Sequence, residues 1–284
     1  MASLRIFTRD MVIRYGLVVV AVGALHGCAN LDAVRQFSKT ASTEVARYGD
    51  AGEAVVESSR TVEPYRIGAP EPRDQADMRR KNVATANALQ ASVVGYFATL
   101  AQLAGEDSFS LEAELDAVQK GLESLPPAVA DPDQVKNAIS LTKTVQKYAL
   151  AHAQSSAVKA LVIEGGPIAM SNVLYMVGIA MSWRGVIEND SKLVENALLN
   201  LSAARDTPPL LAILARDRLQ QHQLHYAQGI ERVDVAIAAL RKIHTAHEAM
   251  KLNLNALDTK ELKSLLKAAV ADLKVARSSL TALR

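Results

Sequence analysis

Two pairs of histidines are the side chains whose type and spacing could hold a metal ion. His222 and His225 are three residues apart, as are His244 and His247, so each pair shares one face of a helix. Glu248 follows His244 by four residues and could add a carboxylate, with a further ligand from another helix. The two pairs are 22 residues apart, roughly 33 Å along a helix, so they cannot form one site within a chain.

The same histidines also fit a purely structural role. His244 and His247 fall on the apolar seam of an expected helix, where they would act as polar packing residues. We expect His222 and His225 to be surface residues. The prediction is therefore no metal and no cofactor, with His244, His247 and Glu248 as the metal candidates to examine.

The motifs of common enzyme classes are missing from the sequence. It has no glycine-rich loop ending in Gly-Lys-Ser/Thr, no Gly-x-Ser-x-Gly turn and no His-Glu-x-x-His. Carboxylate pairs such as Asp131 and Asp133 stand at expected helix starts, where capping and the helix dipole explain them. We predict a protein that is not an enzyme, and an enzyme with dispersed catalytic residues is the alternative.

The charge balance argues against nucleic acid as a partner. The chain of 284 residues has a formal net charge of +2, but residues 1–27 contribute three arginines and one aspartate. Without them, basic and acidic residues are equal in number, whereas a nucleic-acid binder normally presents a basic face.

Residues 165–183 form an uncharged stretch of 19 residues. Apolar residues would cover every side of a helix there, which is typical of a helix buried on all sides. A membrane-seeking segment, as in helical pore-forming proteins, and an exposed partner-binding patch are the alternatives. The residues that would carry either role are Ile168, Leu174, Val177, Ile179 and Trp183.

The N-terminus has the order of a secretory signal. Arg5, Arg9 and Arg14 form a basic region, and Leu17 to Leu25 is an apolar run of nine residues, too short for a stable membrane span. Small residues and Cys28, the single cysteine of the chain, follow directly. An internal disulfide is therefore excluded. A single free thiol would be a hazard in an oxidising compartment, so we expect Cys28 to be modified.

The ending of this signal resembles the lipobox of bacterial lipoproteins. Leu25, Gly27 and Cys28 match that pattern, whereas His26 stands where a small residue is usual. The resemblance implies that Cys28 receives diacylglycerol, that the chain is cut before it, and that lipid tethers the body. Ala29 is not the aspartate that favours inner-membrane retention, so the resemblance implies the outer membrane, with the body in the periplasm.

The body is expected to be all-α, because apolar residues recur at helical spacing and no long stretch alternates with period two. Residues spaced by three and four from Leu31 to Val62 form a heptad seam. Leu219, Tyr226 and Val233 belong to another. We predict helices over approximately 31–62, 75–104, 110–125, 131–164, 167–187, 189–205, 207–254 and 258–283.

These helices should form an elongated antiparallel bundle with coiled-coil-like seams. The expected organisation is a signal at 1–27, long N-terminal helices at 28–125 and a bundle at 131–284, which could be one domain with them. The predicted function is a lipid-anchored scaffold or adaptor that binds another cell-envelope component. The alternatives are a membrane-active protein that uses residues 165–183 and a periplasmic binder of an apolar ligand.

Overall fold

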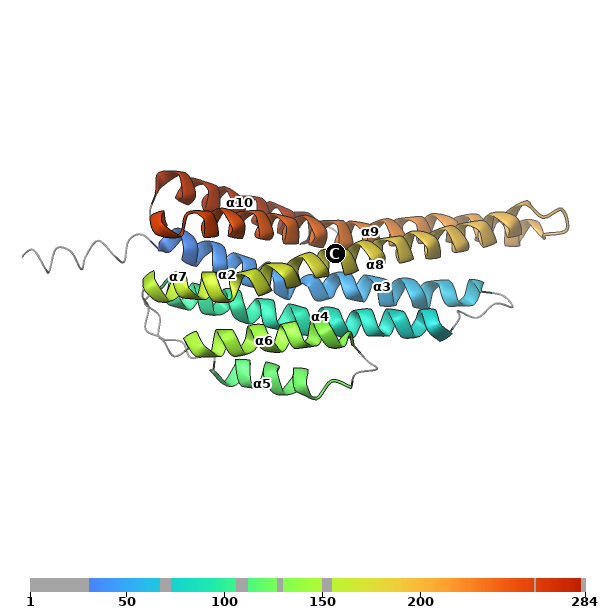
Figure 1. Cartoon of the computed structure of the whole chain (residues 1–284). Coiled ribbons are helices and arrows are strands. Elements are labelled where there is room, and N and C mark those ends of the chain that lie inside the picture. The colour runs from blue at the N-terminus through green and yellow to red at the C-terminus, as the bar shows by residue number, and fades with distance from the viewer. Residues whose placement is uncertain are drawn as a thin grey trace, which may run out of the picture.

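The computed structural model shows an all-α helical bundle. It describes residues 31–66, 73–105, 112–126, 130–149, 155–257 and 259–281, and no strand occurs among them. The long helices lie side by side along one axis (Figure 1). Their bounds are α2 (Asp32–Ala46), α3 (Tyr48–Val62), α4 (Arg73–Leu103), α5 (Glu112–Glu123), α6 (Pro132–Ala149), α7 (Ser155–Glu164), α8 (Gly166–Ala203), α9 (Pro209–Leu252) and α10 (Lys260–Thr281), with short 3₁₀ turns η1 (Glu63–Tyr65) and η2 (Leu254–Ala256).

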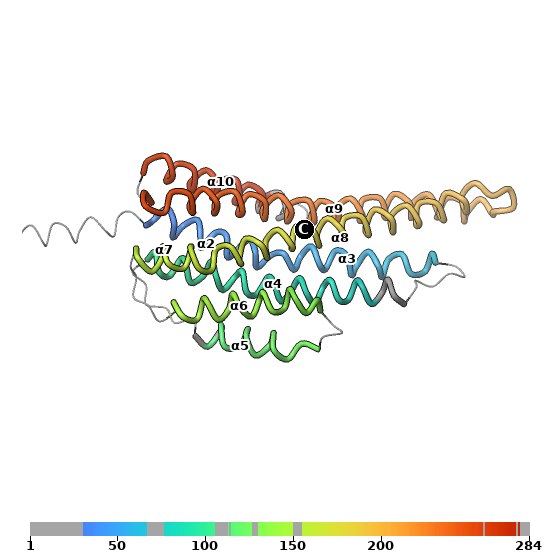
Figure 2. The backbone as a smooth tube through the Cα atoms, viewed as in Figure 1, coloured from blue at the N-terminus to red at the C-terminus, as the bar shows by residue number. Residues whose placement is uncertain are grey.

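Helices α8 and α9 form a long hairpin that runs the length of the molecule. They contain 38 and 44 residues, so α9 is about 66 Å long. Residues 204–208 join them, and the two helices pack against each other more extensively than any other pair. Pro209 is the first residue of α9. An N–H group at this position has no partner within a helix, so a proline there costs no hydrogen bond. The hairpin projects beyond the ends of the neighbouring helices (Figures 1 and 2).

The first half of α8 packs against α3 through aromatic side chains. The Tyr48 hydroxyl donates a hydrogen bond to the main-chain oxygen of Met176 at 2.7 Å, and the rings of Tyr48 and Trp183 lie 5.2 Å apart. Gly52 lies beneath Trp183, where an added Cβ would stand 3.3 Å from the indole ring. The small residue therefore lets the largest side chain of the core fit between the two helices.

The N-terminal seam is buried as its spacing predicts, but one uninterrupted helix over 31–62 is wrong. Every seam position from Leu31 to Val62 is buried except the half-buried Ser59. The chain forms a tighter turn at Arg47, whose N–H bonds to the oxygen of Glu44, three residues back. Val45 and Tyr48 lie on either side of this turn. Their spacing of three residues matches the turn, so both side chains remain buried.

Two further helix boundaries differ from the prediction. The helix expected over 131–164 is two helices, because α6 ends at Ala149 and α7 begins at Ser155. The helices expected over 167–187 and 189–205 are one, since α8 continues through Asp190. The predicted start at Asp131 is confirmed, because its Oδ1 accepts hydrogen bonds from the N–H groups of Asp133 and Gln134 at 3.0 and 3.4 Å.

The uncharged stretch 165–183 is mostly core, but burial on every side is wrong. Val177, Ile179 and Trp183 are buried and Ile168 is half-buried. Leu174 is 50% exposed on a stripe that also contains small and polar residues. No single described helix has the length and hydropathy of a membrane span, although α7 and α8 together, bent by 53°, do.

This burial predicts unequal responses to the same charge at two nearby positions of α8. Val177→Asp puts an unpaired carboxylate into the core and should lower the free energy of unfolding by about 3 kcal/mol or more. Leu174→Asp, on the exposed stripe, should change it by about 0.5 kcal/mol. Urea unfolding followed by circular dichroism measures both, and equal effects would contradict the packing of α8.

Candidate functional site

His247 lies inside the bundle and bonds to a tyrosine of another helix. Its Nε2 is 2.7 Å from the hydroxyl of Tyr96 on α4, and both side chains have no exposed surface. Gly166, at the start of α8, touches this pair, since a Cβ there would lie 2.8 Å from the His247 ring. Gly165-Gly166 therefore allows α8 to begin close against α4 and α9.

The surroundings keep His247 neutral. Burial, with smaller repulsions from Lys251 and His244, lowers the pKa of His247 to about 3. Burial also raises the pKa of Tyr96 above its ordinary value. The pair is thus a hydrogen-bonded link between α4 and α9 at neutral pH, as the structural interpretation of His247 predicts.

The three metal candidates do not converge on a site. His247 points into the core with its Nδ1 3.9 Å from Glu248, whereas His244 is half-buried on the neighbouring turn. Across the described residues, histidine and carboxylate side chains form no group of three that could hold a metal ion.

The other histidine pair is less exposed than expected. The Nε2 of His222 lies 2.9 Å from the hydroxyl of Tyr65 in η1, and His225 Nδ1 lies 3.9 Å from a Glu57 oxygen. Both rings are half-buried, so they are partly covered rather than fully exposed surface residues. They pack η1 and α3 against α9, which the sequence spacing alone did not indicate.

A buried ionic cluster explains why α8 does not stop near residue 190. The Asp190 side chain is 4% exposed and accepts a hydrogen bond from Ser58 at 2.8 Å. Arg66 lies 3.2 Å and Arg79 3.7 Å from its carboxylate oxygens. The sequence predicts a new helix from residue 189, but Asp190 instead joins α3, α4 and the chain after η1 to a point about two-thirds of the way along α8.

A groove opens beside this cluster, between α3 and α4. It has a volume of about 530 Å³, within the usual size of small-molecule sites. The two helices diverge here, although α4 packs closely along α2. The groove is lined by Val55, Val56, Ser59, Arg60, Glu63, Arg79, Arg80, Val83, Ala84 and Asn87.

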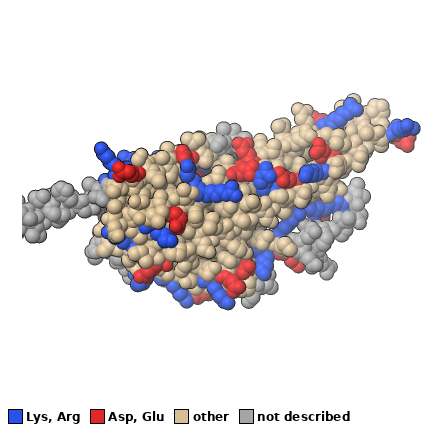
Figure 3. All heavy atoms as spheres, turned by 45° about the horizontal axis from the view of Figure 1, so that its top comes forward, with Lys and Arg blue, Asp and Glu red and all other residues tan. Residues whose placement is uncertain are grey.

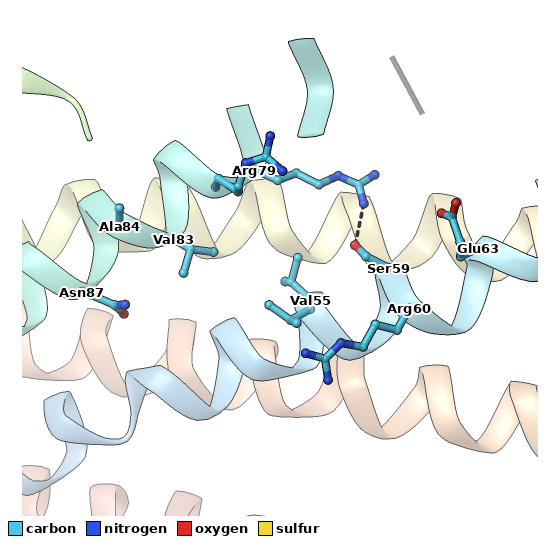
Figure 4. A pocket seen from close by; sticks show the side chains of 10 residues that line it. Val55, Ser59, Arg60, Glu63, Arg79, Val83, Ala84 and Asn87 are labelled. Atoms are coloured by element: carbon cyan, nitrogen blue, oxygen red, sulfur yellow. Dashed lines mark hydrogen bonds between the residues drawn. The ribbon is translucent and has the colours of Figure 1, made fainter. Parts of the chain in front are cut away.

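Apolar and basic side chains occupy different parts of the groove (Figure 4). Val55 on α3 and Val83 on α4 point toward each other across the opening. Arg79 extends from α4 toward α3, where its Nη1 donates a hydrogen bond to Ser59 Oγ at 2.7 Å. The groove therefore combines an apolar surface with a basic end.

The end of the α8·α9 hairpin is the other surface with unusual composition. Large apolar side chains there are between 44% and 67% exposed. We use the term hairpin end for the residues that carry them, Leu199, Leu201, Leu210, Leu211, Ile213 and Leu214. Figure 3 shows this projecting part as uncharged surface interrupted by a few basic and acidic side chains.

Sequence reasoning missed both the groove and the hairpin end. The run Pro208 to Leu214 is typical of a helix start, but six of its seven residues, all except Ala212, are proline or large and apolar. That run was the available signal. The groove had none, because its residues come from two helices whose divergence is a property of packing.

The lipobox residues Leu25, Gly27 and Cys28 lie outside the residues that the structure describes, so lipid attachment stays a prediction. Comparison of the chain with protein-family models, with curated proteins and with solved structures found no match.

The buried histidine predicts a loss of stability in acid. An unfolded histidine takes up a proton below about pH 6.5, whereas folded His247 does so only near pH 3, so stability falls as pH falls through this interval. In His247→Gln, whose amide can still bond to Tyr96, the slope of unfolding free energy against pH should decrease by up to about 1.4 kcal/mol per pH unit.

Urea unfolding at several pH values between 4 and 6.5 measures this slope. His244→Gln is the matched control, since His244 is half-buried on the same helix, and it should leave the slope close to that of the unchanged chain. An unchanged slope in His247→Gln would show that the folded histidine takes up its proton normally.

Proposed function

We propose that this chain is a lipid-anchored adaptor of the bacterial cell envelope that binds a protein partner through the hairpin end. Cys28 would carry the lipid in the outer membrane, and the helical body would stand in the periplasm. The observation that carries the proposal is the projecting α8·α9 hairpin, whose end exposes six leucine and isoleucine side chains.

The positions of the proposed tether and of the hairpin end support an adaptor. Helix α2 begins at Asp32, only four residues after Cys28, so little chain separates the lipid from the bundle. The start of α2 lies at one end of the molecule and the hairpin end at the other (Figure 1). The bundle would therefore hold the hairpin end tens of ångströms from the membrane that carries the lipid, roughly the length of α9.

The shape of the bundle suits this role. We infer an elongated antiparallel bundle in which α9 has a coiled-coil-like seam, since Tyr226, Val233, Leu240 and His247 are spaced by seven and all buried. Such a seam keeps a long helix pair stiff and straight. A stiff hairpin presents its end with little loss of conformational entropy when a partner binds.

The composition of the hairpin end supports a protein partner. Exposed apolar groups of this size usually mark an interaction surface, with polar residues at the rim. Charged residues interrupt the apolar ones at the hairpin end: Arg205 and Asp206 stand at the turn, and Arg216, Asp217 and Arg218 follow on α9. Deep insertion into hydrocarbon would bury charges at the turn, whereas a protein surface can pair them.

We propose a binding role and no catalytic one. Two of the buried ionisable groups bond within the fold: His247 bonds to Tyr96, and Asp190 is held by Ser58 and two arginines. Neither group opens onto the groove or the hairpin end as a nucleophile beside a base. The proposal includes neither a cofactor nor a nucleic-acid partner.

The anchor predicts the behaviour of two variants at the proposed processing site. Cys28→Ser should abolish incorporation of radiolabelled palmitate and release the chain from the outer-membrane fraction, because acyl chains contribute about 0.8 kcal/mol per buried methylene. Ala29→Asp should keep the label and move the chain toward the inner membrane, as the lipoprotein resemblance implies. Palmitate on the Cys28→Ser chain would disprove the assignment of the lipid site.

The hairpin end predicts a position-dependent crosslink in the native host. A photo-reactive amino acid at Ile213, 61% exposed, should give one dominant crosslinked envelope protein, whereas Val275, 68% exposed on α10, should not. Leu210→Asp with Leu214→Asp should remove that product, and Cys28→Ser should weaken it. Leu210 lies in the first turn of α9, where an aspartate favours the helix, so the variant should stay folded.

Leu252→Asp with Val275→Asp is the matched control for the hairpin variant, since both residues are well exposed elsewhere, and it should keep the crosslink. Equal products from positions 213 and 275 would exclude a specific partner at the hairpin end. Crosslinks to lipid alone, together with dye release from liposomes by the purified chain, would replace the adaptor with a membrane-active protein.

A further inference from the structure

The groove between α3 and α4 has a floor suited to a hydrocarbon chain. Val55 is buried beneath it, Val56 is 39% exposed, and Val83 and Ala84 are half-buried on the facing helix. These side chains form a continuous apolar surface that the described helices leave uncovered. Water in contact with such a surface is displaced favourably by an apolar ligand.

One end of the groove is basic. Arg60 lies on α3, Arg80 on α4, and Arg79 reaches across between the two helices (Figure 4). Glu63 is the carboxylate among the lining residues, and its Oε2 lies 3.8 Å from Nη1 of Arg66. Asp190 and Asp77 oppose Arg79 and Arg80, and Arg66 opposes Glu63, so Arg60 leaves this group of residues with a net positive charge that attracts an anion.

The arginines at this end differ in how firmly they are held. Arg79 is fixed by Ser59 and by the buried carboxylate of Asp190, which positions the basic end relative to the apolar floor. Arg80 pairs with Asp77 on its own helix, and both side chains are largely exposed. An exposed pair of this kind contributes little, so Arg80 can exchange its partner for a ligand at low cost.

We propose that the groove binds a single-chain amphiphile with a carboxylate head, such as a long-chain fatty acid. The hydrocarbon chain lies on Val55, Val56, Val83 and Ala84, and Arg60 and Arg80 hold the carboxylate from the two sides of the groove. Guanidinium groups form paired, charge-assisted hydrogen bonds with a carboxylate. The volume of about 530 Å³ suits one chain rather than a two-chain phospholipid.

This site is separate from the hairpin end and needs no lipid at Cys28, so it goes beyond the adaptor proposal and can fail independently of it. It also differs from a cavity within the bundle, because the groove lies on the surface between α3 and α4. A single-chain carboxylate is a product that enzymes releasing acyl chains from lipids would supply.

The test uses the full chain as the host produces it, transferred from detergent into lipid nanodiscs. The probe is palmitate with a photo-reactive diazirine in its chain, and peptide mass spectrometry locates the adducts. We expect adducts on α3 and α4 within residues 55–63 and 79–87, competed by unlabelled palmitate and not by hexadecanol. The same diazirine chain with an alcohol head should label the groove more weakly.

Variants separate the head from the chain. Arg60→Gln with Arg80→Gln should weaken palmitate binding about tenfold or more, the equivalent of one charge-assisted hydrogen bond. Ala84→Trp should block the groove and abolish the adducts, while the melting temperature reports that the bundle is folded. Arg216→Gln with Arg218→Gln removes two exposed arginines elsewhere and should leave binding unchanged.

Equal labelling by the carboxylate and the alcohol, or loss of binding in the Arg216/Arg218 control, would overturn the assignment of a carboxylate ligand. Adducts outside α3 and α4, or adducts that survive Ala84→Trp, would overturn the site. Competition by two-chain phosphatidylglycerol as strong as that by palmitate would overturn the single-chain ligand and assign the groove to membrane lipid.

Discussion

The carboxylate of Asp190 is buried about two-thirds of the way along α8, and much of the architecture depends on how its charge is neutralised. A buried carboxylate costs several kcal/mol unless it is paired and hydrogen-bonded. Ser58, Arg66 and Arg79 meet that requirement from α3, from the residue after η1 and from α4. Because these partners come from separate parts of the chain, the ion cluster ties the N-terminal helices to α8 at one position.

The same cluster has consequences in both directions along the molecule. Since Asp190 is satisfied by other helices, it does not compete for the main chain of α8, and α8 continues to Ala203 as one helix. That continuity carries the hairpin beyond its neighbours and exposes its end. Arg79, held by Asp190 and Ser59, also spans the space between α3 and α4 beside the groove. The two surfaces proposed to bind partners therefore share a structural support.

At the start of α8, small residues allow close packing against the neighbouring helices. Gly165 and Gly166 let the chain bend by 53° between α7 and α8 and bring α8 against Tyr96 and His247. The neutral histidine and the tyrosine share one hydrogen bond through Nε2 in an apolar environment, whereas the buried Nδ1 of His247 has no hydrogen-bond partner among the described residues. This contact places the start of α8 against both α4 and α9. A stiff bundle would hold the hairpin end at a fixed distance from the proposed tether.

The sequence by itself determined the helical class, the buried faces of most helices and the cap at Asp131, because these depend on local spacing and on hydrogen bonds between near neighbours. It also supplied the lipid attachment at Cys28, which stays a prediction. Only the tertiary structure decided that 131–164 divides, that α8 runs through Asp190, and that Leu174 is exposed whereas Val177 is not. These outcomes depend on which distant side chains meet, as do the groove and the hairpin end. A helical pattern shows which residues lie on an apolar face, but the packing of the other helices decides which of those residues are buried.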